Sequence, residues 1–191
     1  MADEITVVDG KIDSVTLLVY LQKIDRKQRA VIFNLGDDRR NKGMFYAQEV
    51  CRDFKIDYDL FDLHFYSKIF SDSQFAVPEV GYLILPIAYS VAVIGEESRV
   101  NYGSHKCNSR FIAAINSACQ IANASLIDIV APFNKLKLSE LIKIGTDLGV
   151  DYRKTWSCEL SGDYHCGNCE QCFDRRQAFV QAGITDPTTY E

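Results

Sequence analysis

Residues 7–18, "VVDGKIDSVTLL", lead from the end of a buried strand through a turn at Gly10 into an apolar helix. Apolar side chains recur at helical spacing from residue 12 to residue 24, which indicates where the helix runs. A strand, a glycine turn and a helix in this order are typical of loops that hold a phosphate at a helix N-terminus. The turn nevertheless carries Asp9 and Lys11, where a phosphate loop favours small residues. The stretch therefore predicts an α/β unit, and it leaves open whether the turn binds a nucleotide.

The remainder of the chain repeats this strand-to-helix order. Strands are expected at residues 4–8, 29–36, 58–65, 98–103 and 125–133, and helices at residues 12–24, 43–56, 78–94, 110–122 and 136–149. The order predicts a parallel sheet covered by helices on both faces, a three-layer α/β fold that takes in residues 1–150. The helix at residues 78–94 is apolar nearly all round, so we expect it in the core, with a contact surface for a partner as the alternative and Pro86 as a kink or break.

Length and charge exclude several classes of protein. The chain has 191 residues, enough for one ordinary domain with a small appended module. Its formal net charge of −5 argues against general nucleic-acid binding, and we expect the charged run at residues 37–42, "DDRRNK", to be a solvated loop. No run of 18 or more apolar residues is present and the first residues are acidic, so neither a membrane span nor a secretory signal is expected. We therefore expect a cytoplasmic protein.

Four of the seven cysteines lie within 15 residues. Spacers of two residues let neighbouring thiolates turn toward one point, Gly167 allows a tight turn, and a longer loop returns the first cysteine to complete a tetrahedron. The spacing therefore predicts a closed, structural zinc site formed by Cys158, Cys166, Cys169 and Cys172. A metal also contributes folding free energy to residues 151–191, which are too poor in apolar residues to fold alone and are expected to form a zinc-binding module packed on the α/β domain.

Other interpretations of these cysteines stay open. An iron–sulfur cluster also accepts four cysteine ligands, and His165 is close enough in sequence to replace one thiolate. Four free buried cysteines are a further alternative. The remaining cysteines, Cys51, Cys107 and Cys119, are expected to be small core residues.

Residues 155–179, "TWSCELSGDYHCGNCEQCFDRRQAF", and residues 182–191, "AGITDPTTYE", contain several motifs together. These are a Thr-Trp-Ser-Cys start, a Cys-Gly-x-Cys-x-x-Cys turn, an arginine after the last cysteine and an Asp-Pro-Thr-x-Tyr end. In these features the segment resembles the C-terminal zinc module of the 7-cyano-7-deazaguanine synthase family. Further resemblances follow in order along the chain, at "FNLG" (33–36), "VPEVGYLIL" (77–85), "FIAAIN" (111–116) and "APF" (131–133).

The resemblance implies the fold of the PP-loop ATP pyrophosphatases and an ATP-dependent C–N ligase activity. Members of the family adenylate 7-carboxy-7-deazaguanine with ATP and Mg2+, and they use ammonia to convert it to the nitrile in queuosine and related deazaguanine metabolism. The resemblance also implies a homodimer, and it places substrate contacts near Tyr102, His105 and Cys107. Within the phosphate loop, the positions that match the family are Gly10, Asp13 and Ser14.

The chain departs from the family at most polar positions of the nucleotide and substrate sites. The family's Ser-Gly-Gly-x-Asp-Ser is residues 9–14, "DGKIDS", here, and its Asp-Tyr-Gly-Gln-Arg-His is residues 34–39, "NLGDDR". Its Val-Pro-Gly-Arg-Asn is replaced by residues 77–81, "VPEVG", its lysine at the start of a late helix by Leu138, and the segment between residues 63 and 78 is shorter than its lid. Like charges a few ångströms apart repel by about 1–4 kcal/mol, so Asp9 is expected to weaken phosphate binding while Lys11 offsets part of its charge.

These departures lead to two functional hypotheses. The first is a catalytically degenerate homologue that serves as a zinc-stabilised binding, regulatory or structural subunit, as a homodimer or with another protein partner. The second is an active enzyme that still converts 7-carboxy-7-deazaguanine, or a related acid, with a remodelled ATP site. Zn2+ is the expected cofactor in both hypotheses, whereas ATP and Mg2+ belong to the second. A deazaguanine-type small molecule is a candidate ligand in either.

Several single residues have competing interpretations. Asp13 and Ser14 are either surviving phosphate-loop residues or, as we favour, capping residues of the following helix. We favour His105 as an exposed loop histidine over a substrate contact, because an isolated histidine carries little specificity. Glu140 is interpreted as a first-turn carboxylate that faces the helix dipole rather than as a retained acid, and the turn at residues 9–11 as solvated rather than as a rebuilt active site.

Overall fold

The computed structural model describes residues 3–36, 38–64, 81–160 and 162–191. Its centre is a five-stranded sheet in the order β3-β2-β1-β4-β5, in which every neighbouring pair of strands is parallel. The strands are β1 (Glu4–Val7), β2 (Gln28–Asn34), β3 (Tyr58–Asp62), β4 (Arg99–Tyr102) and β5 (Asp128–Val130). The predicted parallel sheet is confirmed.

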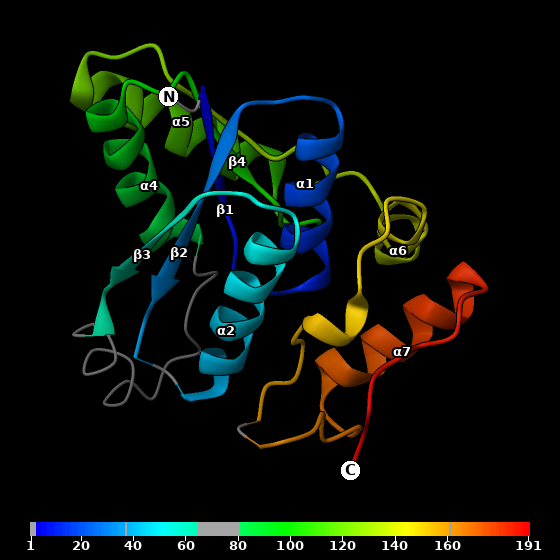
Figure 1. The fold of residues 1–191 in the computed structure, drawn as a ribbon. Helices are drawn as coiled ribbons and strands as arrows, with labels where there is room; N and C mark the ends of the chain where they lie inside the picture. Colours follow the sequence, from blue (N-terminus) through cyan, green and yellow to red (C-terminus); the bar gives the residue numbers. More distant parts are fainter. Residues whose placement is uncertain (1–2, 37, 65–80, 161) are drawn as a thin grey trace.

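Helices cover both faces of the sheet and give the predicted three layers (Figure 1). One face carries α1 (Ile12–Lys23) and α2 (Asp38–Asp53), and the other carries α4 (Gly81–Gly95) and α5 (Ser109–Asn123). Val19 and Val50 belong to the core cluster under α1 and α2, and Leu85 and Tyr89 to the cluster under α4 and α5. The apolar α4 thus packs into the core, with Pro86 inside the helix.

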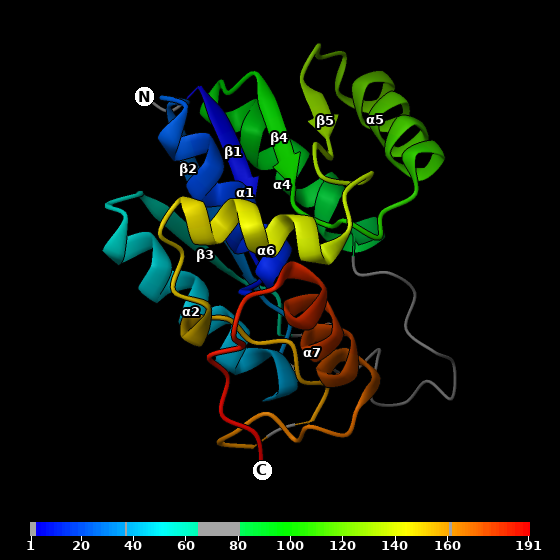
Figure 2. The ribbon, with the colours of Figure 1, turned by 90° about the vertical axis from the view of Figure 1, so that its right-hand side faces the viewer.

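The chain after β5 returns to the face that carries α1. There α6 (Leu138–Asp147) packs on α1, the short 3-10 helix η2 (Tyr152–Lys154) follows, and α7 (Glu170–Ala182) packs on α6 (Figure 2). Phe179 and Ala182 of α7 belong to the same core cluster as α1 and α2. The C-terminal segment is therefore packed on the α/β core, while its status as a separate domain stays a prediction.

Some bounds differ from the expected ones. α2 begins at Asp38, so the run expected as a loop is helical from that residue onward, because arginine and lysine are good helix formers and an aspartate suits a helix start. β5 has three residues and ends before Pro132, at the edge of the sheet. Residues 65–80, which hold the "VPEV" match and most of the shortened lid segment, lie outside the described residues.

Two further expectations can be compared with the structure. Cys51, Cys107 and Cys119 are buried members of the core clusters, as predicted. Within the part of the chain that the structure describes, no helix combines the length and the apolar character that a membrane crossing requires.

Candidate functional site

The candidate site lies where the winding of the sheet reverses. β1 is paired with β2 on one side and β4 on the other, and the helices that follow β1 and β4 pack on opposite faces. In parallel α/β sheets, ligands bind at such a reversal, outside the carboxyl ends of the strands. Here the loops after β1 and β4 touch directly, because a Cβ atom on Gly103 would overlap the Cα atom of Ser14. The two loops therefore form one surface.

The turn after β1 is closed by its own aspartate. Oδ1 of Asp9 accepts hydrogen bonds from the Ser14 hydroxyl at 2.6 Å and from the backbone N–H of Lys11 at 3.1 Å. The ammonium of Lys11 lies 3.7 Å from Oδ2 of the same carboxylate, and both side chains are about half exposed. A backbone N–H, a hydroxyl and an ammonium are groups that a phosphate would use. In this turn all three face a carboxylate of the chain itself.

Gly10 is held by packing. It has a φ of +80°, and a Cβ atom at this position would overlap the carbonyl oxygen of Gly43 in α2. Its own carbonyl accepts the backbone N–H of Trp156 at 2.9 Å. A glycine is therefore required here by α2 and the C-terminal segment, whether or not a phosphate binds.

Asp13 is paired with His105 across the junction of the two loops. Nδ1 of His105 lies 2.8 Å from Oδ2 of Asp13, and the backbone N–H of His105 donates to the same oxygen at 3.2 Å. Burial raises the pKa of Asp13, but the hydrogen bond and the charge of His105 outweigh burial and hold that pKa below its ordinary value. The His105 side chain is only 16% exposed. The prediction of an exposed loop histidine is wrong, because the carboxylate that pairs with it lies 92 residues away in the sequence.

The capping interpretation of Asp13 and Ser14 is also wrong. The N-cap residue of α1 is Lys11, which makes no side-chain capping bond, and both residues lie in the first turn of the helix. Ser14 donates its hydroxyl to Asp9 instead, and Asp13 accepts the N–H of Ser14 at 3.0 Å. Glu140, by contrast, is a first-turn carboxylate of α6 as predicted, and it accepts the N–H of Lys137 at 2.7 Å.

The structure brings the four clustered cysteines together. The sulfur atoms of Cys158, Cys166, Cys169 and Cys172 all lie within 4.8 Å of one another. Tetrahedral zinc with Zn–S bonds of about 2.3 Å holds its sulfurs about 3.8 Å apart, so the observed spacing suits one central ion. Five backbone N–H groups donate to three of these sulfurs at 3.4 Å: those of Leu160 and Cys166 to Cys158, of Asn168 and Cys169 to Cys166, and of Cys172 to Cys169. The cluster can hold a metal ion.

The thiols of this cluster differ in acidity. Burial raises the pKa of Cys158 and Cys172, whereas hydrogen bonds from the backbone N–H groups of Asn168 and Cys169 lower the pKa of Cys166 to about 7. Buried thiolates at this spacing repel one another unless a cation lies between them. The chemistry of the four sulfurs therefore fits a metal ion bound by thiolates.

His165 packs beside the cluster and uses its acceptor nitrogen elsewhere. Nε2 accepts the backbone N–H of Ser157 at 3.1 Å, and the ring lies 4.2 Å from that of Trp156 between centroids. Burial, followed by the charge of Arg175, lowers the pKa of His165 to about 4. The geometry therefore favours a neutral packing residue over a substitute metal ligand.

Comparison with known proteins adds to this geometry. Residues 77–183 match the model of a family described as "Queuosine biosynthesis protein QueC". The whole chain aligns with 7-cyano-7-deazaguanine synthase of Marinobacter nauticus, at 31% identity and over 99% of that protein. The chain belongs to the QueC family. A second family member, the synthase of Caldicellulosiruptor saccharolyticus, is 28% identical over 98% of this chain and 95% of its own length. The Marinobacter alignment has 219 positions, 28 more than this QueC-family chain has residues.

Solved structures support the PP-loop-type fold of this family member. NMN synthetase of Francisella tularensis superposes with a TM-score of 0.61 at 16% identity, over 97% of this chain and 79% of that one. The U34-tRNA thiolase NcsA of Methanococcus maripaludis, which carries a [4Fe-4S] cluster, has a TM-score of 0.58 at 14% identity, over 94% of this chain and 64% of its own. At these identities the likeness shows the fold alone.

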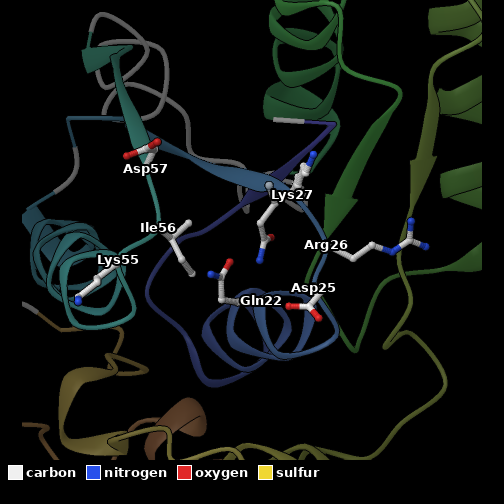
Figure 3. Close-up of a pocket in the computed structure, with 8 residues that line it drawn as sticks. Gln22, Asp25, Arg26, Lys27, Lys55, Ile56 and Asp57 are labelled. Atoms are coloured by element: carbon white, nitrogen blue, oxygen red, sulfur yellow. The ribbon is translucent and has the colours of Figure 1, made fainter. Parts of the chain in front are cut away.

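Two depressions border the described residues of this QueC-family chain. One, of about 180 Å³, lies beside His105 at the carboxyl end of the sheet. The other, of about 260 Å³, lies at the opposite end, between the turns that precede β2 and β3 (Figure 3). Figure 3 shows the side chains of Arg26 and Lys55 pointing away from each other, so this second depression has no converging cations.

Sequence reasoning missed the role of Arg175. This fully buried guanidinium donates to Oγ1 of Thr155 at 2.9 Å, to Oγ1 of Thr188 at 2.7 Å and to the carbonyl of Tyr152 at 2.8 Å. It thereby ties α7 to the chain before the cysteines and to the C-terminal tail. The sequence marked this arginine as part of a motif, but nothing local indicated partners 13 to 23 residues away.

Proposed function

We propose that this QueC-family chain is a catalytically degenerate homologue of the synthases, and that it serves as a zinc-stabilised binding, regulatory or structural subunit. The observation that carries the proposal is the carboxylate of Asp9, which accepts the hydroxyl of Ser14 and the N–H of Lys11 within the phosphate loop. A triphosphate would have to displace this carboxylate or lie beside it.

Either outcome is unfavourable for ATP. Hydrogen bonds to a charged acceptor contribute about 1.5–3 kcal/mol, and displacement would break two of them. The carboxylate would then stay within a few ångströms of the phosphates, where like charges repel by about 1–4 kcal/mol, partly offset by Lys11. We therefore expect ATP affinity at least about tenfold below that of a loop without Asp9.

The neighbouring loop leaves little room for a nucleotide. The carboxylate of Asp13 accepts from His105 at the junction, so it is already engaged where a metal-bound phosphate would lie. The adjoining depression has about 180 Å³, whereas pockets for small-molecule ligands usually have about 300–1,000 Å³. Among the described residues, this end of the sheet therefore favours a smaller ligand.

We propose zinc as the occupant of the four-cysteine cluster. The sulfurs lie within 4.8 Å of one another, which suits a single central ion, whereas a cluster of several iron and sulfide atoms would hold them farther apart. Four thiolates leave no open position, so the ion would supply folding free energy and no chemistry. It would hold residues 158–172 together and thereby keep Trp156 against Gly10.

An active ATP-dependent synthase is the second candidate. It is supported by 31% identity to a named synthase over the whole chain and by Asp13 and Ser14 in the phosphate loop. Such an enzyme would rebuild its ATP site around these residues, with ATP and Mg2+, and would convert 7-carboxy-7-deazaguanine or a related acid to the nitrile.

Calorimetric titration of the zinc-loaded protein with ATP–Mg2+ separates the two candidates. The degenerate subunit is expected to show no saturation at millimolar ATP, and no pyrophosphate is expected when 7-carboxy-7-deazaguanine and ammonia are added. Saturable ATP binding together with pyrophosphate release would establish the enzyme instead. A titration with 7-carboxy-7-deazaguanine alone reports whether a deazaguanine-type ligand is bound.

We further propose that the chain acts in the cytoplasm, as a homodimer or with another protein. All seven cysteines are free thiols, which suits a reducing compartment. The family resemblance supports self-association. Light scattering across a range of protein concentrations tests the dimer, and a constant monomer mass would refute it.

A further inference from the structure

The depression beside His105 is built by three separate parts of the chain. It lies between the loop after β4, the start of α6 and one face of α7. Lys106 and Asp174 form an ion pair at 2.7 Å that joins the loop to α7. Because α7 follows the cysteine cluster, the depression exists only when the C-terminal segment is folded.

Ser139 presents an unused hydroxyl to this depression. The residue is only 8% exposed and borders the depression, and among the described residues its side chain has no hydrogen-bond partner. It is the second residue of α6, so its backbone N–H and that of Leu138 have no acceptor within the helix. The start of α6 therefore offers a hydroxyl and two N–H groups at one wall.

His105 contributes from the opposite wall. Its Nδ1 is engaged by Asp13 at 2.8 Å, so Nε2 is the nitrogen left for the depression that the ring borders. A carboxylate partner stabilises a positive charge on an imidazole ring, which then donates through Nε2. An acceptor held between Ser139 and His105 would thus meet donors on both sides.

The charge balance of the lining favours an anion. Asp174 is the one carboxylate that borders the depression, and its ion pair with Lys106 offsets its charge. Gln177 and Gln181 lie one turn apart on α7 and add neutral amide groups. Hydrogen-bond donors therefore exceed the acceptors that lack partners.

We propose that this depression binds a small oxyanion, a carboxylate or a phosphate group, through the hydroxyl of Ser139, the N–H groups at the start of α6 and Nε2 of His105. Its volume of about 180 Å³ admits such a group and falls short of the pockets that take larger ligands. The inference goes beyond the proposed function, because an active synthase and a degenerate homologue could both carry the site, and the ATP titration tests that function separately.

Imidazole NMR on the full-length, metal-loaded protein tests the site directly. The chain has three histidines, so substitution assigns the signals of His64, His105 and His165. Inorganic phosphate and, separately, acetate are titrated at constant pH and ionic strength, with chloride as the balancing salt. We expect the His105 signals to shift along a saturation curve, while those of the other two histidines stay in place. Saturation by phosphate assigns a phosphate group, and saturation by acetate a carboxylate.

Variants connect the shift to the proposed donors. Ser139→Ala is expected to weaken binding at least about tenfold, because a hydrogen bond to a charged group is lost. Ser117→Ala, on the exposed face of α5, is the matched control and should leave the affinity unchanged. If Ser139→Ala loses the native near-ultraviolet spectrum, the exposed Gln177→Leu takes its place, with a few-fold weakening expected. The proposal is overturned if neither anion shifts His105 with saturation, or if the shift survives the folded variants unchanged.

Discussion

The phosphate loop at residues 9–14 and the cysteine loop at residues 158–172 use the same local device with opposite results. Both precede or open a helix, and both direct backbone N–H groups at an acceptor. In the first loop the acceptor is the carboxylate of Asp9, so the donors are satisfied within the chain. In the second the acceptors are four sulfurs that converge on one point, and among the described residues no cationic group joins them there. One loop is complete without a ligand, and the other gains most from one.

The largest effect is expected from breaking the cysteine loop. Removal of the metal by a chelator, or Cys169→Ser, should unfold the C-terminal segment, since structural zinc contributes on the order of 10 kcal/mol to folding. Trp156 is the only tryptophan and is buried, so its fluorescence should shift to longer wavelength. Cys119→Ser, at a buried cysteine outside the cluster, should keep about one zinc per chain by metal analysis. A stable, metal-free native protein would refute the zinc assignment.

A smaller but still large effect is expected at Arg175. Arg175→Ala removes a fully buried cation that donates to Thr155, Thr188 and the carbonyl of Tyr152, and it should lower the free energy of unfolding by about 3–5 kcal/mol. Urea denaturation measures the loss. Arg153→Ala is the control, because the Arg153 side chain is 72% exposed and should cost less than about 0.5 kcal/mol. Equal effects of the two variants would show that Arg175 does not hold the tail.

The junction of the two nucleotide-site loops should respond to pH. The pKa of Asp13 is lower in the folded protein than its ordinary value of 3.8, so its carboxylate stabilises the fold above that value, and the stabilisation is lost as the pH falls through the folded pKa. Asp13→Asn should therefore lower the free energy of unfolding by about 1–3 kcal/mol at pH 7, and the difference from the native protein should shrink below a pH of about 4.

Urea denaturation at several pH values measures this difference. Asp163→Asn, at a side chain that is 94% exposed, is compared at each pH so that any release of metal in acid affects both variants alike. A difference for Asp13→Asn that stays constant down to pH 2 would contradict a folded-state pKa below the ordinary value.

The two loops also differ in how far the sequence could predict them. The cysteine cluster is defined by spacing within 15 residues, and the α/β pattern by apolar periodicity within each element, so both were predictable from local signals. The charge of Asp9 was visible as well. Its hydrogen bond to Ser14 was not, because a sequence does not show which donor a side chain meets.

Long-range pairs explain the remaining errors. Asp13 and His105 are 92 residues apart, and only the winding of the sheet places β1 beside β4, so neither the pair nor the burial of His105 had a local signal. The start of α2 at Asp38 was missed for another reason. A run of charged residues was taken as a loop, although arginine and lysine favour helices when one face of the helix packs.

The most direct test of the account is a calorimetric ATP–Mg2+ titration of the native protein beside the double variant Asp9→Ser with Lys11→Gly, both metal-loaded, with Asp163→Asn as the control. If the carboxylate of Asp9 takes up the donors of the loop, the double variant should bind ATP at least about tenfold more tightly than the native protein, and the control should match the native protein. Equal affinity of the native protein and the double variant would contradict the account.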